Sequence, residues 1–257
     1  MSTAPELVDL LAERRGLVCA VGAGGKKSVL RAIAAAHPGR VALTGTVPFV
    51  PHPEAPDARR CSAELDALAA ELAACTGPGT VIYGRPEQKK GRWGGVPPEV
   101  ITDWHERFGF DATLVKADGA RMRWVKAPAA DEPVLTPACA TLIPVQSPRA
   151  LGEPLSERTA HRAPLVAELT GCGSGEAFQP EHAARLLASE HGLLKSAGRA
   201  RVCPVINMVD DEERRALALA TARRALQLTD RFDQVLLLCL KKDPKVVAVV
   251  RRGDAAA

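Results

Sequence analysis

The chain has 257 residues, and its 34 Lys and Arg outnumber its 30 Asp and Glu, which leaves a net charge of +4. Hydrophobic residues make up 46 % of the chain, so we expect one folded α/β domain over residues 1–257 rather than a disordered chain. The small charge excess and the 5 Phe, 3 Trp and 1 Tyr argue against a nucleic-acid-binding protein, which needs a clustered basic surface or stacking aromatics.

Neither a membrane segment nor a secretion signal is expected. No apolar run reaches the roughly 18 residues that a membrane-spanning helix needs. The first nine residues contain no basic segment followed by an apolar run, as a signal peptide would. The seven cysteines are dispersed and form no C-x-x-C pair, so neither a zinc site nor a disulfide framework is expected, and the simplest location is a reducing cytoplasm.

Strands and helices are expected to alternate along the chain. Short apolar runs predict strands over 17–21, 41–43, 80–83, 112–115, 140–143 and 202–206. Apolar periodicity and helix-start signals predict helices over 27–36, 62–74 (with Ser62 as N-cap) and 210–228. Two β-branched runs, 235–240 and 246–250, predict a C-terminal β-hairpin. This order is typical of an α/β fold with a mostly parallel central sheet and helices on both faces.

Three stretches interrupt this order. The proline-rich segment 52–60 and the segment 84–98, which is rich in glycine and lysine, are expected to be loops. Residues 150–200 are expected to be helical, either as a small lobe or as an insertion on the same sheet.

A glycine-rich turn joins the first predicted strand to the first helix. Its residues are Gly22, Ala23, Gly24, Gly25, Lys26, Lys27 and Ser28. The backbone N–H groups of such a turn hold phosphate oxygens, and Lys26 would reach the terminal phosphates. The P-loop motif is G-x-x-x-x-G-K-[ST]; here Ala20 replaces its first glycine, and Lys27 replaces the hydroxyl that binds Mg²⁺. We predict a P-loop-like phosphate site, and the alternative is a tight turn without a ligand.

Asp118 follows a predicted strand and precedes Gly119, at the edge where open α/β sheets bind ligands. Its carboxylate is a candidate ligand for Mg²⁺ or a water, and the alternative is an Asp-Gly turn. Arg121 and Lys126 follow closely, and either clamp an anion or are solvated. The same two interpretations apply to the pair His161 and Arg162.

Another predicted strand ends in Asn207-Met-Val-Asp210. GTPases place Asn-Lys-x-Asp at such a strand end, where the aspartate accepts hydrogen bonds from guanine N1 and N2. Met208 replaces the lysine here. Asp210 therefore either contacts a base or serves as the N-cap of the following helix.

Taken in order, these segments resemble the YqeC family, whose members are described as accessory or cofactor biosynthesis proteins for selenium-dependent hydroxylases. Val21 to Lys26 is similar to that family's G-x-G-G-K-[TS] loop, and the segment with Thr44 and Thr46 is similar to its threonine-rich strand end. The family's A-D-G, K-x-P and E-P motifs have counterparts at 117–119, 126–128 and 132–133. His161-Arg162, Gly192 to Lys195 and Asn207 to Asp210 follow in the family's order.

The chain departs from the family pattern at three kinds of position. Lys27 stands where the family has Thr or Ser, Gly45, Val47 and Pro48 change the threonine-rich block, and Lys116 replaces an acidic residue before Asp118. These changes add positive charge where a metal ion would otherwise neutralise phosphates. Three consequences are open: nucleotide binding with little Mg²⁺, binding of a different anion, or loss of catalysis.

The resemblance implies a nucleotide-dependent role in maturing a selenium-containing molybdenum hydroxylase or its cofactor. ATP or GTP would bind at residues 22–28, with Lys26 and Asp118 as the catalytic residues and Asp118 as the Mg²⁺ ligand. Catalysis would be NTP hydrolysis or phosphoryl or nucleotidyl transfer. One alternative is a carrier or chaperone for the cofactor that has lost turnover, and another is an ATP-dependent ligase-like enzyme.

Overall fold

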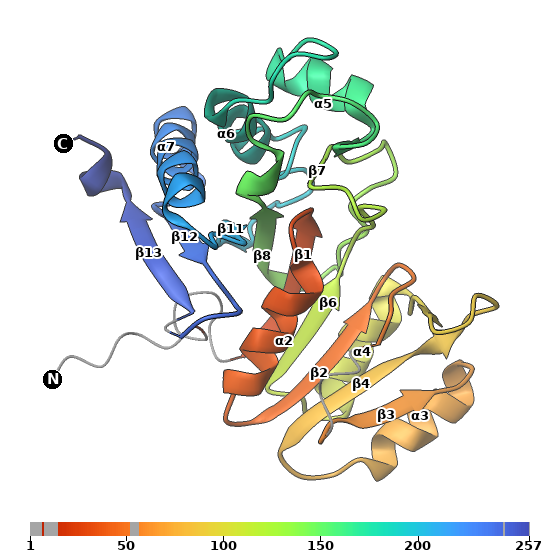
Figure 1. The fold of residues 1–257 in the computed structure, drawn as a ribbon. Helices are drawn as coiled ribbons and strands as arrows, with labels where there is room; N and C mark the ends of the chain where they lie inside the picture. The colour runs from red at the N-terminus through yellow and green to blue at the C-terminus, as the bar shows by residue number, and fades with distance from the viewer. Residues whose placement is uncertain (1–6, 8–14, 52–56, 244, 257) are drawn as a thin grey trace, which may run out of the picture. The chain divides into compact units, whose positions relative to one another are not determined.

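The computed structural model describes residues 7, 15–51, 57–243 and 245–256 (Figure 1). The sequence expectation for the first nine residues therefore falls almost entirely outside the described residues, as does the predicted loop between residues 52 and 56. Contacts divide the chain into two compact units. The first consists of the segments up to Ala20, Lys27–Asp118 and Val134–Thr141, and the second of Val21–Lys26, Gly119–Pro133 and the chain from Leu142.

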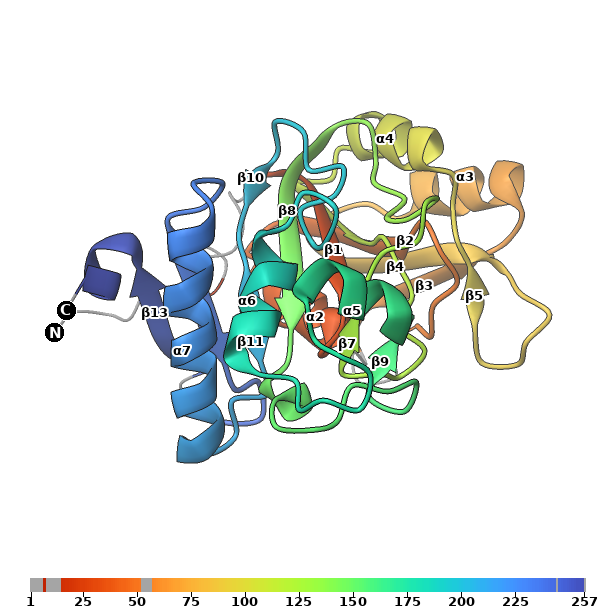
Figure 2. The same ribbon diagram turned by 90° about the horizontal axis from the view of Figure 1, so that it is seen from above.

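The first unit is built on parallel strands in the order β1, β6, β2, β4, β3, with β5 antiparallel on β4. The strands are β1 (Gly16–Gly22), β2 (Arg40–Gly45), β3 (Arg59–Ser62), β4 (Gly79–Pro86), β5 (Trp93–Gly94) and β6 (Ala112–Lys116). The helices are α2 (Lys26–Ala36), α3 (Leu65–Ala74) and α4 (Pro98–Arg107). Figures 1 and 2 show α2 on one face of these strands and α3 and α4 on the other.

Burial on both faces explains why β1 and β6 are continuously apolar. Val18, Ala20 and Leu114 are fully buried, as expected for central parallel strands between two helical layers. Leu68 and Leu72 of α3 are equally inaccessible, and their spacing of four residues places them on the same face of the helix.

The second unit carries parallel strands in the order β8, β11, β12, with β13 antiparallel on β12 (Figure 1). Its main strands are β8 (Cys139–Gln146), β10 (Arg201–Val202), β11 (Val205–Asn207), β12 (Gln234–Leu238) and β13 (Val246–Arg251). β7 (Val125–Lys126) and β9 (Ala160–His161) form a separate parallel pair. Its helices are η1 (Pro148–Ala150), α5 (Ala163–Thr170), α6 (Pro180–Ala188), α7 (Glu212–Leu228) and η2 (Arg252–Ala256). α7 packs against α6 and against the β12–β13 hairpin.

The α/β fold, the mostly parallel sheet, the helices on both faces and the C-terminal hairpin are confirmed. The helical content predicted for 150–200 is present as α5 and α6. Within the described residues, no helix combines the length and the apolar character that crossing a membrane requires. The single domain and the P-loop-like character stay predictions.

Several boundaries were wrong. Ser62 ends β3 instead of capping a helix, and the N-cap of α3 is Glu64. The last two residues of the predicted loop at 52–60 belong to the same strand β3. Residues 84–98 are not all loop, because β4 continues to Pro86 and pairs with β5.

In the second unit, the strand predicted over 202–206 is two short strands separated by Cys203 and Pro204, because proline cannot donate to the ladder. The last predicted helix begins at Glu212 rather than Asp210.

Candidate functional site

The loop between β1 and α2 needs its glycines for conformation and for space. Gly24 and Gly25 have φ angles of +101° and +104°, which other residues rarely adopt. A Cβ at Gly24 would lie 2.7 Å from the carbonyl of Gln146, and a Cβ at Gly25 would lie 2.6 Å from Nδ2 of Asn207. The loop is therefore packed tightly onto the carboxyl ends of β8 and β11.

Two amide groups of this loop have no hydrogen-bond partner within the described part of the chain. The Ala23 N–H donates to the carbonyl of Val145 at 2.9 Å. The N–H groups of Gly24 and Gly25 find no acceptor among the residues that the structure describes, although Gly24 is buried. Buried N–H groups in proteins are nearly always paired, and here they immediately precede the positive end of α2. Backbone donors in this arrangement commonly hold anions.

Lys26 begins α2 and is 5 % exposed. Its ammonium donates to the carbonyl of Gly22, so the side chain folds back over its own loop. Lys27 and Ser28 follow in the first turn and are partly exposed. The side chain of Lys26, which was predicted to reach phosphates, is therefore hydrogen-bonded to its own loop. In the sequence, Lys26 directly follows Gly24 and Gly25.

Asn207, at the end of β11, links its strand to the glycine loop. Its Nδ2 donates to the carbonyl of Gly24 at 2.9 Å, across 183 positions of sequence. Asn207 is 2 % exposed, and its Oδ1 is buried without a hydrogen-bond partner among the described residues. The structure thus brings together the loop and Asn207, two elements that the sequence analysis had singled out separately.

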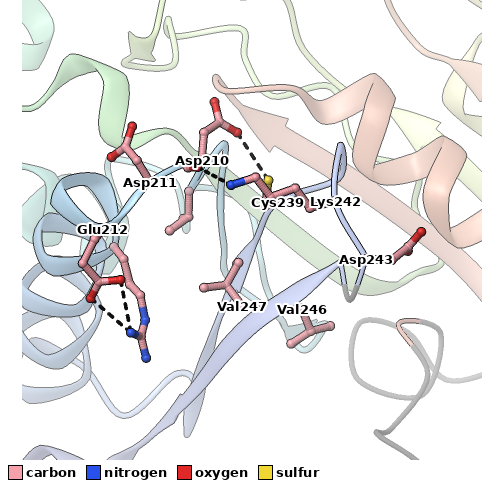
Figure 3. A pocket seen from close by; sticks show the side chains of 10 residues that line it. Asp210, Asp211, Glu212, Cys239, Lys242, Asp243, Val246 and Val247 are labelled. Carbon is pink, nitrogen blue, oxygen red and sulfur yellow. Dashed lines mark hydrogen bonds and ion pairs between the residues drawn. The ribbon is translucent and has the colours of Figure 1, made fainter.

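Asp210 is held by residues that the sequence analysis did not identify. Its carboxylate accepts a hydrogen bond from Arg149 at 2.8 Å. It also accepts one from the Cys239 thiol at 3.5 Å, while Lys242 donates to the backbone carbonyl of Asp210 at 2.7 Å (Figure 3). The hydrogen bond from Arg149 holds the pKa of Asp210 below its usual value. The interpretation of Asp210 as an N-cap is wrong, because Asp211 caps α7 by accepting from the N–H of Arg214.

The remaining sequence candidates of the first unit are buried or internally bonded. Asp118 lies two residues after the end of β6 and is 1 % exposed. The hydroxyl of Thr44 donates to the carbonyl of Tyr83 at 2.9 Å, and that of Thr46 donates to the carbonyl of Val134 at 2.7 Å. The Thr44 bond therefore links β2 to β4, and the Thr46 bond fixes the loop that follows β2.

A buried ion-pair network in the second unit contains two further candidates. Glu132 accepts hydrogen bonds from Lys126 at 2.5 Å and from Arg162 at 2.8 Å. Burial raises the pKa of Glu132, but the two cations outweigh that effect and lower it overall. The pKa of neighbouring His161 is lowered by burial and then by the nearby positive charges. Arg121 is exposed, with a φ of +45°.

Cys172, Glu176 and His182 form a cluster of potential metal ligands whose donor atoms lie within 4.8 Å of one another. His182 Nδ1 accepts the N–H of Gln179 at 3.1 Å, so the neutral ring carries its proton on Nε2, which faces Glu176 at 4.0 Å. A protonated ring nitrogen offers no lone pair, and the cluster as arranged stabilises the start of α6.

The functional residues missed from the sequence are Arg149, Cys239 and Lys242. Arg149 lies in η1 and Lys242 in the β12–β13 turn, and neither belongs to a motif. Cys239 carried no signal either, because it falls inside the strand predicted over 235–240, whereas β12 ends at Leu238 and places Cys239 at the carboxyl end of the strand.

Comparisons with known proteins identify the family. The family described as YqeC protein matches residues 18–164, which include the glycine loop and the ion-pair network. The chain is 30 % identical over 195 residues to a protein of Escherichia coli strain K12 named "Uncharacterized protein YqeC", and the match covers 74 % of this chain and 75 % of that protein. No solved structure is significantly similar. The chain belongs to the YqeC family.

Proposed function

We propose that this protein binds a nucleoside triphosphate, ATP or GTP, at residues 22–28. The observation that supports this most directly is that the N–H groups of Gly24, which is buried, and Gly25 find no acceptor in the described ranges of the chain, just ahead of α2. A phosphate oxygen is an acceptor that would satisfy both, and the helix end adds favourable electrostatics.

Lys26 and Asp118 have separate roles in this proposal. The ammonium of Lys26 exchanges the Gly22 carbonyl for terminal phosphate oxygens and neutralises them as a point charge. The carboxylate of Asp118 is a hard oxygen ligand of the kind that Mg²⁺ takes, and the ion would supply further charge neutralisation. Phosphoryl or nucleotidyl transfer, or hydrolysis, would then depend mainly on positioning and charge.

The biological role that we propose rests on the family resemblance. The protein would act in the cytoplasm as an accessory factor for the maturation of a selenium-dependent molybdenum hydroxylase or its cofactor. Binding of a nucleotide would drive or time that step.

Replacing Lys26 tests the nucleotide site. Lys26→Ala should weaken binding of ATP or GTP at least tenfold, about 1.4 kcal/mol, because it removes the ammonium that the proposal places on the terminal phosphates. Isothermal titration calorimetry with and without Mg²⁺ measures this, and melting temperatures show whether the variant is folded.

The matched control is Lys89→Ala, which removes an equal charge from an exposed turn. Lys89→Ala should bind nucleotide as tightly as the unmodified chain does. Unchanged affinity in a folded Lys26→Ala protein, or no nucleotide binding by the unmodified chain, would contradict the proposal.

A second candidate is a carrier that binds nucleotide or cofactor without turnover. Lys27 favours it, because this position lacks the hydroxyl that holds Mg²⁺ in P-loop enzymes. Measurement of phosphate release from ATP and GTP with and without Mg²⁺ separates the two, since a carrier that binds nucleotide would release none.

A further inference from the structure

A cavity of about 340 Å³ lies between the β11–α7 connection and the β12–β13 turn. Figure 3 shows Asp210 beside Cys239 and Lys242 at this place, with Val246 and Val247 below them. All of its lining residues belong to the second unit. Three valines give the cavity apolar walls that suit the faces of a flat ring, and its charged lining consists of four carboxylates and two cations: Asp210, Asp211, Glu212, Asp243, Arg215 and Lys242. Two of these carboxylates are already engaged by neighbouring arginines, Asp211 by Arg214 and Glu212 by Arg215.

The carboxylate of Asp210 has capacity for two more hydrogen bonds. An ionised carboxylate offers about four lone-pair sites. Arg149 occupies one on Oδ2 and the Cys239 thiol occupies one on Oδ1. The side chain of Asp210 is 21 % exposed, so the two remaining sites are accessible to a ligand. The hydrogen bond from Arg149 lowers the pKa of Asp210 further below neutral pH and fixes the orientation of the carboxylate.

An acceptor pair of this kind discriminates between bases. Guanine presents two adjacent donors, N1–H and the N2 amino group, on one edge. Adenine and cytosine present one donor beside a ring nitrogen that is an acceptor, which would face the carboxylate unfavourably. Uracil presents a single N–H between two carbonyls. Guanine is therefore the base that an open, ionised carboxylate selects.

The same strand end connects this cavity to the glycine loop. Asn207 lies three residues before Asp210 and donates to Gly24, and its Oδ1 is buried without a partner among the described residues. One short segment of chain therefore touches the proposed phosphate loop and supplies Asp210 to the cavity, as a single nucleotide spanning both would require.

We propose that the nucleotide is a guanine nucleotide, with its base in this cavity and its N1–H and N2 groups donating to Asp210. This inference rests on the proposed function, because the phosphates would occupy residues 22–28. Cys239 and Arg149 are positioning residues for the carboxylate, and Lys242 fixes the backbone at Asp210.

The test compares three nucleotides and three proteins by titration calorimetry. The unmodified chain should bind GTP at least tenfold more tightly than ATP or xanthosine triphosphate. Asp210→Asn should reverse the preference to xanthosine triphosphate, because the asparagine amide donates to the xanthine O2 that replaces the guanine amino group. Glu213→Gln removes one charge from the same exposed helix end and should keep the preference for GTP.

The outcomes are distinct. Equal binding of ATP and GTP by the unmodified chain would overturn this inference and leave the proposed function intact. A preference for GTP that persists in a folded Asp210→Asn protein would also overturn it. Failure of every nucleotide to bind would overturn both. If Asp210→Asn does not fold, the selectivity of the unmodified chain alone decides.

Discussion

At the scale of single residues, Glu132 is the carboxylate that binds two cationic side chains, Lys126 and Arg162. The side chain of Lys126 is fully buried, and that of Arg162 is 27 % exposed. Both are held by the same carboxylate oxygen. A buried ammonium without its counter-charge is costly, so the network depends on Glu132 more than on either base.

Glu132→Gln should lower the free energy of unfolding at pH 7 by about 3 kcal/mol, because Lys126 and Arg162 would both lose the negative charge that they share. The pKa of Glu132 is lowered in the folded chain, so its stabilisation is complete above the ordinary value of 4.5 and is lost as the pH falls through the folded pKa. Urea denaturation at pH 7 and pH 4 measures both effects. Glu153→Gln, at an exposed position, is the control; equal losses in the two variants would contradict the role of Glu132.

At the scale of elements, the C-terminal residues complete the end of α7. The guanidinium of Arg252 donates to the carbonyls of Leu226, Thr229 and Phe232, the latter two at 2.8 Å each. These carbonyls belong to the last turn of the helix and the residues after it, where a cation also complements the negative end of the helix dipole.

Arg252→Ala should therefore destabilise the protein by about 2 kcal/mol, since it removes charge-assisted hydrogen bonds from several carbonyls at once. Thermal unfolding followed by circular dichroism gives the change. The neighbouring Arg251→Ala, which alters an exposed side chain at the end of β13, should leave the melting temperature almost unchanged. If Arg251→Ala lowered the melting temperature as much as Arg252→Ala, the cause would be the loss of a positive charge and not the loss of these hydrogen bonds.

The burial of an element largely decides whether it could be predicted from the sequence. The central strands β1 and β6 were predictable because both of their faces are buried, whereas β3 reads Arg-Arg-Cys-Ser and pairs with one strand only. α4 was missed because Pro97 and Pro98 read as a break, although proline is favourable in the first turn of a helix.

The site was predictable in its parts and not in its assembly. The glycine loop and the Asn207 segment each carried a local pattern. Their contact depends on the order of strands in space, which spacing along the chain does not encode. Arg149 and Cys239 act only through Asp210, so nothing in their own neighbourhoods marked them.

At the scale of the whole molecule, each unit is assembled from three separate segments of chain. Before Leu142, the second unit contains only residues 21–26 and 119–133. These two segments provide Gly24, which bonds Asn207, and Glu132, which bonds Arg162. Neither unit therefore corresponds to a continuous piece of sequence that contains all of its own contacts.

A fragment of residues 142–257 should consequently be much less stable than the full chain. It retains α5, α6, α7 and the hairpin but lacks the loop that Asn207 bonds and the carboxylate that Arg162 bonds. Urea denaturation should show a lower midpoint and a less cooperative transition. A fragment that unfolds at the same midpoint as the full chain would show that these short segments contribute little.

The contact of Arg149 with Trp124 has an optical consequence. The guanidinium lies 5.2 Å from the centre of the indole ring while its nitrogen bonds Asp210. The other two tryptophans, Trp93 and Trp104, belong to the first unit. A charge beside an indole alters the wavelength and yield of its fluorescence. The intrinsic fluorescence of Trp124 should therefore change whenever Arg149 moves away from the ring.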